Sequence, residues 1–165
     1  MIARRALLSL VPALAACGYR PVRAAEGGAF AVRPGCSTVA EPRALFEVVA
    51  GARRALSREG AHDPGSTQTL VVDVSRLDEV TSGLARSVDG VSGRGTTLTL
   101  VGRALVEPGG ADTGELEVAG ESAWEGDPAL DAARRAEVVA SLGRRLGEAM
   151  ALTILGLPTT DRARL

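Results

Sequence analysis

The chain is poor in the side chains on which enzymes and metal centres depend. Its 165 residues include one histidine, two cysteines, one tryptophan, one tyrosine and two phenylalanines, and neither lysine nor asparagine occurs. His62 sits in a turn rich in Gly, Pro and Asp with no nucleophile motif beside it, which favours a solvated loop residue over a general base. The histidine, the cysteines and the carboxylates do not fall at the spacing of a known metal site. We therefore expect no enzymatic activity, no metal and no cofactor.

The charge of the chain argues against a nucleic-acid partner. The formal net charge is −1, and all 19 basic residues are arginine. Domains that bind DNA or RNA usually show a basic excess clustered on one face. No such excess is present, so we expect no nucleic acid among the partners.

The first seventeen residues have the pattern of an export signal that ends at a lipid-attachment cysteine. Arg4 and Arg5 form a positive start, residues 6–14 are apolar, and Leu14, Ala15, Ala16 and Cys17 match the box that lipoprotein signal peptidase cuts. The apolar stretch is shorter than the roughly 20 residues that span a bilayer. We predict a signal peptide over residues 1–16 and lipidation of Cys17. Ordinary secretion, with cleavage before Gly18 or a later small residue, is the alternative.

Lipidation of Cys17 would determine where the protein is located and how its chain is divided into anchor, tether and domain. Acyl chains such as palmitate on Cys17 would hold the protein on a membrane, and Gly18, where an Asp would favour the inner membrane, favours the outer membrane with the protein facing the periplasm. Residues 17–28 are then a lipidated start and flexible tether, residues 29–157 a single α/β domain, and residues 158–165 a polar tail. Cys36 is left as an odd thiol, unless Cys17 is unlipidated and the two cysteines form a disulfide.

Hydrophobic periodicity predicts six elements in the order strand, helix, strand, strand, strand, helix. They are a short strand at Phe30 and Val32 ended by Pro34, a helix from Pro42 to Gly60, strands over 68–80, 96–107 and 115–125, and a helix of about 28 residues after an Asp127 N-cap, with an apolar stripe of Leu130, Val138, Leu142, Leu146, Met150 and Ile154. The glycine-rich connection over 81–95 is either a mobile loop or a widened hairpin end.

The order of elements predicts an α+β two-layer sandwich: a mixed four-stranded sheet with two helices on one face. The first helix can connect two parallel strands, and the short connections that follow predict an antiparallel meander. Along residues 115–125, Leu116, Val118, Gly120, Ser122 and Trp124 alternate with Glu115, Glu117, Glu121 and Glu125. The glutamates predict a face open to water, so both helices should cover the opposite face.

Arg86 and Arg94 are the candidate ligand-binding side chains. They lie in the glycine-rich connection, where guanidinium groups can form bidentate hydrogen bonds with phosphate or carboxylate. Asp89 lies between them, and simple loop solubility is the alternative. The glycines around them do not have the spacing of a dinucleotide fingerprint and precede a strand instead of following one.

The cysteine box followed by Gly18, Tyr19, Arg20 and Pro21, together with the order of elements, resembles the lipopolysaccharide-assembly lipoproteins (LptE) of divergent proteobacteria. The resemblance implies an outer-membrane lipoprotein that plugs and helps assemble the lipopolysaccharide-translocating β-barrel, contributing to lipopolysaccharide transport to the outer leaflet. The implied partners are that barrel, lipopolysaccharide, and the membrane through the N-terminal lipid. Lipid A phosphates would favour Arg86 and Arg94 as contacts. The alternative is another outer-membrane lipoprotein adaptor in envelope assembly, such as an activator of a cell-wall synthase.

Overall fold

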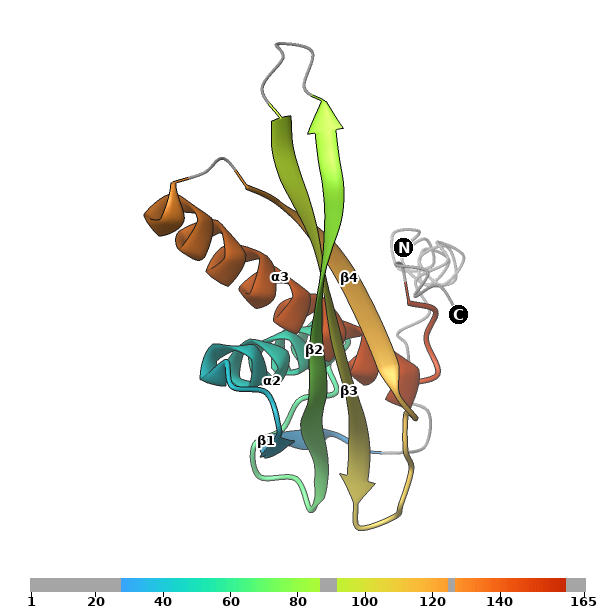
Figure 1. The fold of residues 1–165 in the computed structure, drawn as a ribbon. Helices are drawn as coiled ribbons and strands as arrows, with labels where there is room; N and C mark the ends of the chain where they lie inside the picture. The colour runs from blue at the N-terminus through green and yellow to red at the C-terminus, as the bar shows by residue number, and fades with distance from the viewer. Residues whose placement is uncertain (1–27, 87–91, 125–126, 160–165) are drawn as a thin grey trace, which may run out of the picture.

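A computed structural model describes residues 28–86, 92–124 and 127–159 of the chain, and the predicted signal peptide and Cys17 lie outside these ranges. The observed order is β1, α2, β2, β3, β4, α3. Both helices cover one face of a mixed four-stranded sheet and leave the other face open (Figure 1). The predicted two-layer α+β architecture is therefore confirmed.

The sheet has the strand order β1-β2-β3-β4. Strand β1 (Phe30–Ser37) runs parallel to β2 (Gln68–Arg86), while β3 (Ser92–Glu107) is antiparallel to both β2 and β4 (Leu116–Trp124). The parallel pair is the one that α2 connects, and the antiparallel pairs are formed by strands that follow one another closely in the sequence, as the lengths of the connections predict.

Strand β1 runs past the point where the sequence predicts its end. Pro34 lies inside the strand, paired in register with Val72, and the register shifts between Pro34 and Ser37. Because β1 is an edge strand, a proline can sit there without removing a ladder hydrogen bond. The prediction that Pro34 and Gly35 end the strand was wrong for this reason.

Strands β2 and β3 form a hairpin much longer than predicted. Their pairing continues through the glycine-rich stretch until Arg86 meets Ser92. Of the two alternatives for residues 81–95, a widened hairpin end is therefore correct for the paired residues. The hairpin projects past the helices at one end of the molecule (Figure 1). A register shift between Val74 and Arg76 marks a bulge in β2 that the alternation in the sequence does not reveal.

Helix α2 (Pro42–Arg58) begins and ends where the sequence predicts. Pro42 occupies the first turn, where its missing N–H costs no helical hydrogen bond. The chain leaves the helix at Gly60, whose φ of 69° is a left-handed conformation that glycine adopts without strain.

Helix α3 (Pro128–Ile154) is capped by Asp127, whose Oδ1 accepts hydrogen bonds from the backbone N–H groups of Ala129 at 2.9 Å and Leu130 at 3.3 Å. The predicted N-cap is confirmed. Most of the predicted apolar stripe is buried or half-buried, but Leu130 is 52% exposed. Its inclusion in the core was wrong because the first turn of α3 extends past the packed core.

The two helices touch through glycines. A Cβ on Gly51 of α2 would collide with the carbonyl oxygen of Arg144, and a Cβ on Gly143 of α3 would lie 3.0 Å from the carbonyl oxygen of Ala44. Gly147 likewise packs on the backbone of Val48. This close approach lets both helices reach the sheet and enclose one core, whose fully buried large side chains include Leu56, Leu70, Leu98, Leu100, Leu142, Leu146 and Met150.

Candidate functional site

The uncovered face of the sheet, which we call the open face, is the largest surface that the fold leaves without a layer. On β3, Leu98, Leu100 and Ala104 point to the helices and are buried, so alternation places Thr99, Val101 and Arg103 on the open face. On β4, Val118 is buried under α3 while Glu117 and Glu121 are exposed. The predicted wet face of β4 is confirmed, whereas Glu125 lies outside the described residues.

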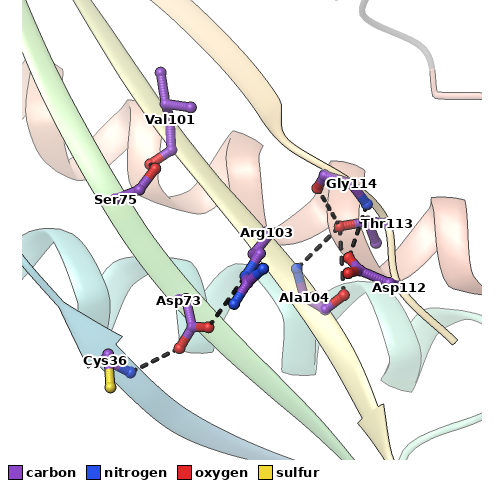
Figure 2. A network of polar contacts seen from close by, with 9 residues as sticks. All are labelled: Cys36, Asp73, Ser75, Val101, Arg103, Ala104, Asp112, Thr113 and Gly114. Atoms are coloured by element: carbon purple, nitrogen blue, oxygen red, sulfur yellow. Dashed lines mark hydrogen bonds and ion pairs between the residues drawn. The ribbon is translucent and has the colours of Figure 1, made fainter. Parts of the chain in front are cut away.

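Asp73 is the centre of a polar network on the open face (Figure 2). Its Oδ1 accepts a hydrogen bond of 2.7 Å from the backbone N–H of Cys36, and its Oδ2 lies 3.6 Å from Nε of Arg103. Gly35 makes this arrangement possible, because a Cβ there would collide with the Asp73 carboxylate. Asp73 thus ties the irregular end of β1 to β3 across β2.

Other ion pairs on the sheet lie across β2 or along it. Arg33 of β1 and Glu107 of β3 form a pair at 2.9 Å, with both side chains more than half exposed. Arg76 and Asp78 pair along β2. Exposed pairs of this kind contribute little to stability, but they fix where each charge stands on the surface.

Two valines, Val71 and Val101, are buried within the charged open face. Val101 is only 2% exposed although neither α2 nor α3 lies over it, and Val71 is also buried. In register, Val101 lies between Arg76 on β2 and Glu117 on β4. The hydroxyl of Ser75, at the bulge, donates to the carbonyl oxygen of Val101 at 3.3 Å (Figure 2). The sequence signal for this buried valine is the run of β-branched residues Thr97, Thr99 and Val101 at the outward positions of β3.

The bulge at Ser75 changes which residues of β2 face the helices. Leu70, Val72 and Val74 are buried before it, whereas after it Glu79 and Thr81 line a cleft of about 280 Å³ under the first turns of α3. Thr96, Leu98, Ser122, Pro128, Asp131, Ala132 and Arg135 complete the lining. The lining of the cleft thus combines hydroxyl and charged groups with the apolar residues Leu98, Pro128 and Ala132.

Arg135 is the charged hub beside this cleft. Its guanidinium lies 3.2 Å from the carboxylate of Glu79 and 3.6 Å from that of Glu41. It also borders a second cavity of about 490 Å³ next to the turn that leads into α2. Because two carboxylates surround it, Arg135 joins α3 to β2 and to the start of α2 and is poorly placed to hold an anion.

Ion pairs also join the two helices along their outer sides. Nη1 of Arg144 is 2.9 Å from the carboxylate of Glu47, and Arg58 donates to Glu148. The hydrogen bond from Arg58 to Glu148, and then the charge of Glu148, raise the pKa of Arg58. Both pairs run between the helices because the glycine contacts bring the two helices close together.

The structure places the backbones of the two candidate arginines at the far end of the hairpin. Arg86 is the last residue of β2 and pairs with Ser92, while Arg94 on β3 lies between Leu84 and Trp124 in register. Their side chains lie outside what the structure describes, so their role stays a prediction. The same holds for Cys17.

The remaining chemistry-bearing residues are separate from one another. His62 is half-buried, and its backbone pairs with Phe30 in an isolated bridge. Cys36 is exposed with a free thiol. Within residues 28–86, 92–124 and 127–159, no group of three or more His, Cys, Asp or Glu side chains could hold a metal. Neither described helix has the length and hydropathy of a membrane span.

The sequence matches no protein-family model and no curated protein. In chain shape, the protein is similar to a minor lipoprotein from Acinetobacter baumannii (9% identity, TM-score 0.48), over 77% of this chain and 91% of that one. It is also similar to rare lipoprotein B from Shewanella oneidensis (9% identity, TM-score 0.45), over 78% and 95% of the two chains. A third similar structure is a putative lipoprotein from Caulobacter crescentus (14% identity, TM-score 0.44), over 76% and 88%. At these identities, no residue role is transferred to this chain.

Proposed function

We propose that this protein is an outer-membrane lipoprotein that plugs and helps assemble the β-barrel through which lipopolysaccharide reaches the outer leaflet. The role is one of binding and scaffolding, without catalysis. The anchor is the lipid on Cys17, which the sequence box at residues 14–17 predicts.

The open face is the observation that carries the proposal. Its charges are already paired across strands, as Asp73 is with Arg103 and Arg33 is with Glu107. Glu117 and Glu121 add exposed carboxylates beside them. The lumen of an outer-membrane barrel is polar and hydrated, so a sheet face that carries paired charges and further exposed carboxylates can line such a lumen.

The long hairpin supports a contact with lipopolysaccharide. Pairing up to Arg86 and Ser92 extends β2 and β3 past the helices (Figure 1). Arg86 and Arg94 lie on this extension, at the end farthest from β1. We propose that their guanidinium groups bind the phosphates of lipid A, since planar guanidinium groups hold phosphate bidentately.

The test is co-purification from native membranes in mild detergent. A plug should leave the membrane with a large barrel protein in about equal amount, and charge reversal on the open face should release it. We therefore expect Glu117→Arg combined with Glu121→Arg to lose the barrel. Each single reversal, Glu117→Arg or Glu121→Arg, is compared with Glu137→Arg as the control of equal charge change, because Glu137 is exposed on α3 and its reversal changes the helix side instead. Recovery of a cell-wall synthase or another envelope enzyme, with no barrel, would establish the adaptor alternative and overturn this proposal.

A further inference from the structure

Helix α2 concentrates positive charge in a protein whose net charge is negative. Its segment Pro42–Arg58 contains four arginines and one acidic residue, Glu47, while the whole chain has a net charge of −1. Glu47 is already paired with Arg144 of α3. The positive excess therefore stays on α2 instead of being cancelled within the helix.

Two of these four arginines, Arg43 and Arg54, lie on the side of α2 that turns away from the rest of the protein. Arg43, Phe46, Ala50 and Arg54 follow one another at helical spacing, and all four are exposed. We call these four residues the α2 outer face. The opposite side, with Val48, Ala52, Ala55 and Leu56, is buried under α3 and the sheet.

Phe46 is the unusual member of the α2 outer face. The chain has two phenylalanines, of which Phe30 is buried in the core and Phe46 is 71% exposed. On either side of it, Arg43 and Arg54 make no hydrogen bond or ion pair with any residue that the structure describes. An exposed aromatic ring between two uncompensated arginines combines an apolar group that can enter the headgroup region with cations that anionic lipids attract.

The other charged surfaces contrast with this one. On the outer side of α3, Arg144 is compensated by Glu47, and Arg135 by Glu41 and Glu79. On the open face, Arg33 and Arg103 each have a carboxylate partner. An anionic surface would therefore compete with a carboxylate partner at Arg33, Arg103, Arg135 and Arg144, but not at Arg43 and Arg54.

We propose that the α2 outer face rests on the anionic phospholipid leaflet that holds the N-terminal lipid, with Phe46 inserted among the headgroups and Arg43 and Arg54 on lipid phosphates. The thirteen residue-to-residue steps from Cys17 to Phe30 extend to at most about 45 Å, which keeps α2 within reach of that leaflet. Each arginine near an anionic surface strengthens binding about fivefold. The inference goes beyond the barrel proposal and needs only the anchor at Cys17.

The experiment uses two exposed apolar positions on opposite sides of the molecule. In full-length lipidated protein carrying Cys36→Ser, a polarity-sensitive fluorophore is attached through Phe46→Cys or, as control, through Val80→Cys. Val80 is 63% exposed and pairs with Thr97 on β3, on the open face. Each protein is reconstituted without a barrel into vesicles of phosphatidylcholine alone or mixed with phosphatidylglycerol.

We expect the label at residue 46 to shift to the blue and brighten in the anionic vesicles only, while the label at residue 80 reports water in both. Adding Arg43→Gln and Arg54→Gln should reverse the shift at residue 46, and high salt should weaken it. Mass spectrometry identifies any preparation that lacks the acyl chains, and flotation then measures whether that protein binds the same vesicles. This separates a missing lipid anchor from an α2 outer face that does not bind the membrane.

Three results would overturn the proposal. The label at residue 46 could stay in water on anionic vesicles, both labels could shift equally, or the shift could require a co-purifying membrane protein. The last result would make a protein wall the occupant of the α2 outer face. None of these results bears on the barrel co-purification, which is measured separately.

Discussion

Gly147 of α3 lies directly against the backbone of Val48 in α2, at a place where a methyl group would collide with the Val48 carbonyl oxygen. Gly51 and Gly143 make similar contacts along the same seam. Helices that meet through glycine can approach more closely than side chains allow. The ion pairs between α2 and α3 depend on this spacing, because Glu47 and Arg144 lie beside the seam.

Replacing Gly147 should therefore destabilise the fold. We expect Gly147→Ala to lower the free energy of unfolding by about 1–3 kcal/mol, since an added methyl group must push the two backbones apart. Urea unfolding followed by circular dichroism measures this. The control is Gly65→Ala, where a Cβ would meet only Oδ1 of Asp63, at an ordinary 3.5 Å. Equal midpoints for the two variants would show that the seam tolerates a side chain.

Asp73 should hold the irregular end of β1 in place. We expect Asp73→Ala to speed hydrogen exchange at the Cys36 amide and to cost about 1 kcal/mol, because the carboxylate accepts that N–H. Asp73→Asn keeps an acceptor oxygen and should largely retain the slow hydrogen exchange of the Cys36 amide. Asp78→Ala removes an exposed carboxylate of β2 and should leave the Cys36 amide unchanged. Unaltered exchange in Asp73→Ala would mean that the strand pairing alone fixes this end of β1.

The two cysteines should differ in reactivity. Cys36 is exposed and free, and lipidation would block Cys17. Titration of the native, detergent-solubilised protein should therefore reveal one thiol per chain, and peptide mapping should locate the alkylated residue at Cys36. Two reactive thiols would indicate an unmodified Cys17, and none would indicate the Cys17–Cys36 disulfide.

The N-cap of α3 should contribute measurably to stability. Asp127→Ala removes the acceptor for the N–H groups of Ala129 and Leu130, so we expect a loss of about 1 kcal/mol and fraying of the first turn. Asp127→Asn retains a cap and should lose much less. If both variants unfold at the wild-type midpoint, the packing of α3 would account for its N-terminus without the cap.

The elements and their faces could be predicted because burial imposes a regular period. Leu98 and Leu100 alternate with threonines, and the glutamates of β4 alternate with apolar residues, so both faces of the sheet could be read from the sequence. The N-cap at Asp127 has an equally local signal. Each of these predictions needs only a few neighbouring residues.

The features that the sequence did not reveal depend on contacts between distant residues. Gly143 and Gly147 have a low helix propensity. They allow α2 and α3 to pack closely, and this contact cannot be seen in the sequence of α3 alone. The glycines near Arg94 left a loop and a hairpin end as alternatives, and only the strand pairing decides for the hairpin, because backbone pairing requires no side chains. The bulge at Ser75 moves Glu79 and Thr81 to the helix side, so the cleft beside Arg135 could not be predicted from strict alternation.

The position of β1 at the edge of the sheet determines how a mechanical load enters the domain. Any pull from an N-terminal anchor arrives at Phe30, the first residue of a strand that has only β2 as a neighbour. Residues outside the sheet hold this point in place. The N–H of Phe30 donates to the carbonyl oxygen of Ala61, and the carbonyl oxygen of Phe30 accepts from the N–H of Asp63. The Ser66 hydroxyl donates to the carbonyl oxygen of Ala29. The loop after α2 thus takes up tension before the strand can peel from its neighbour.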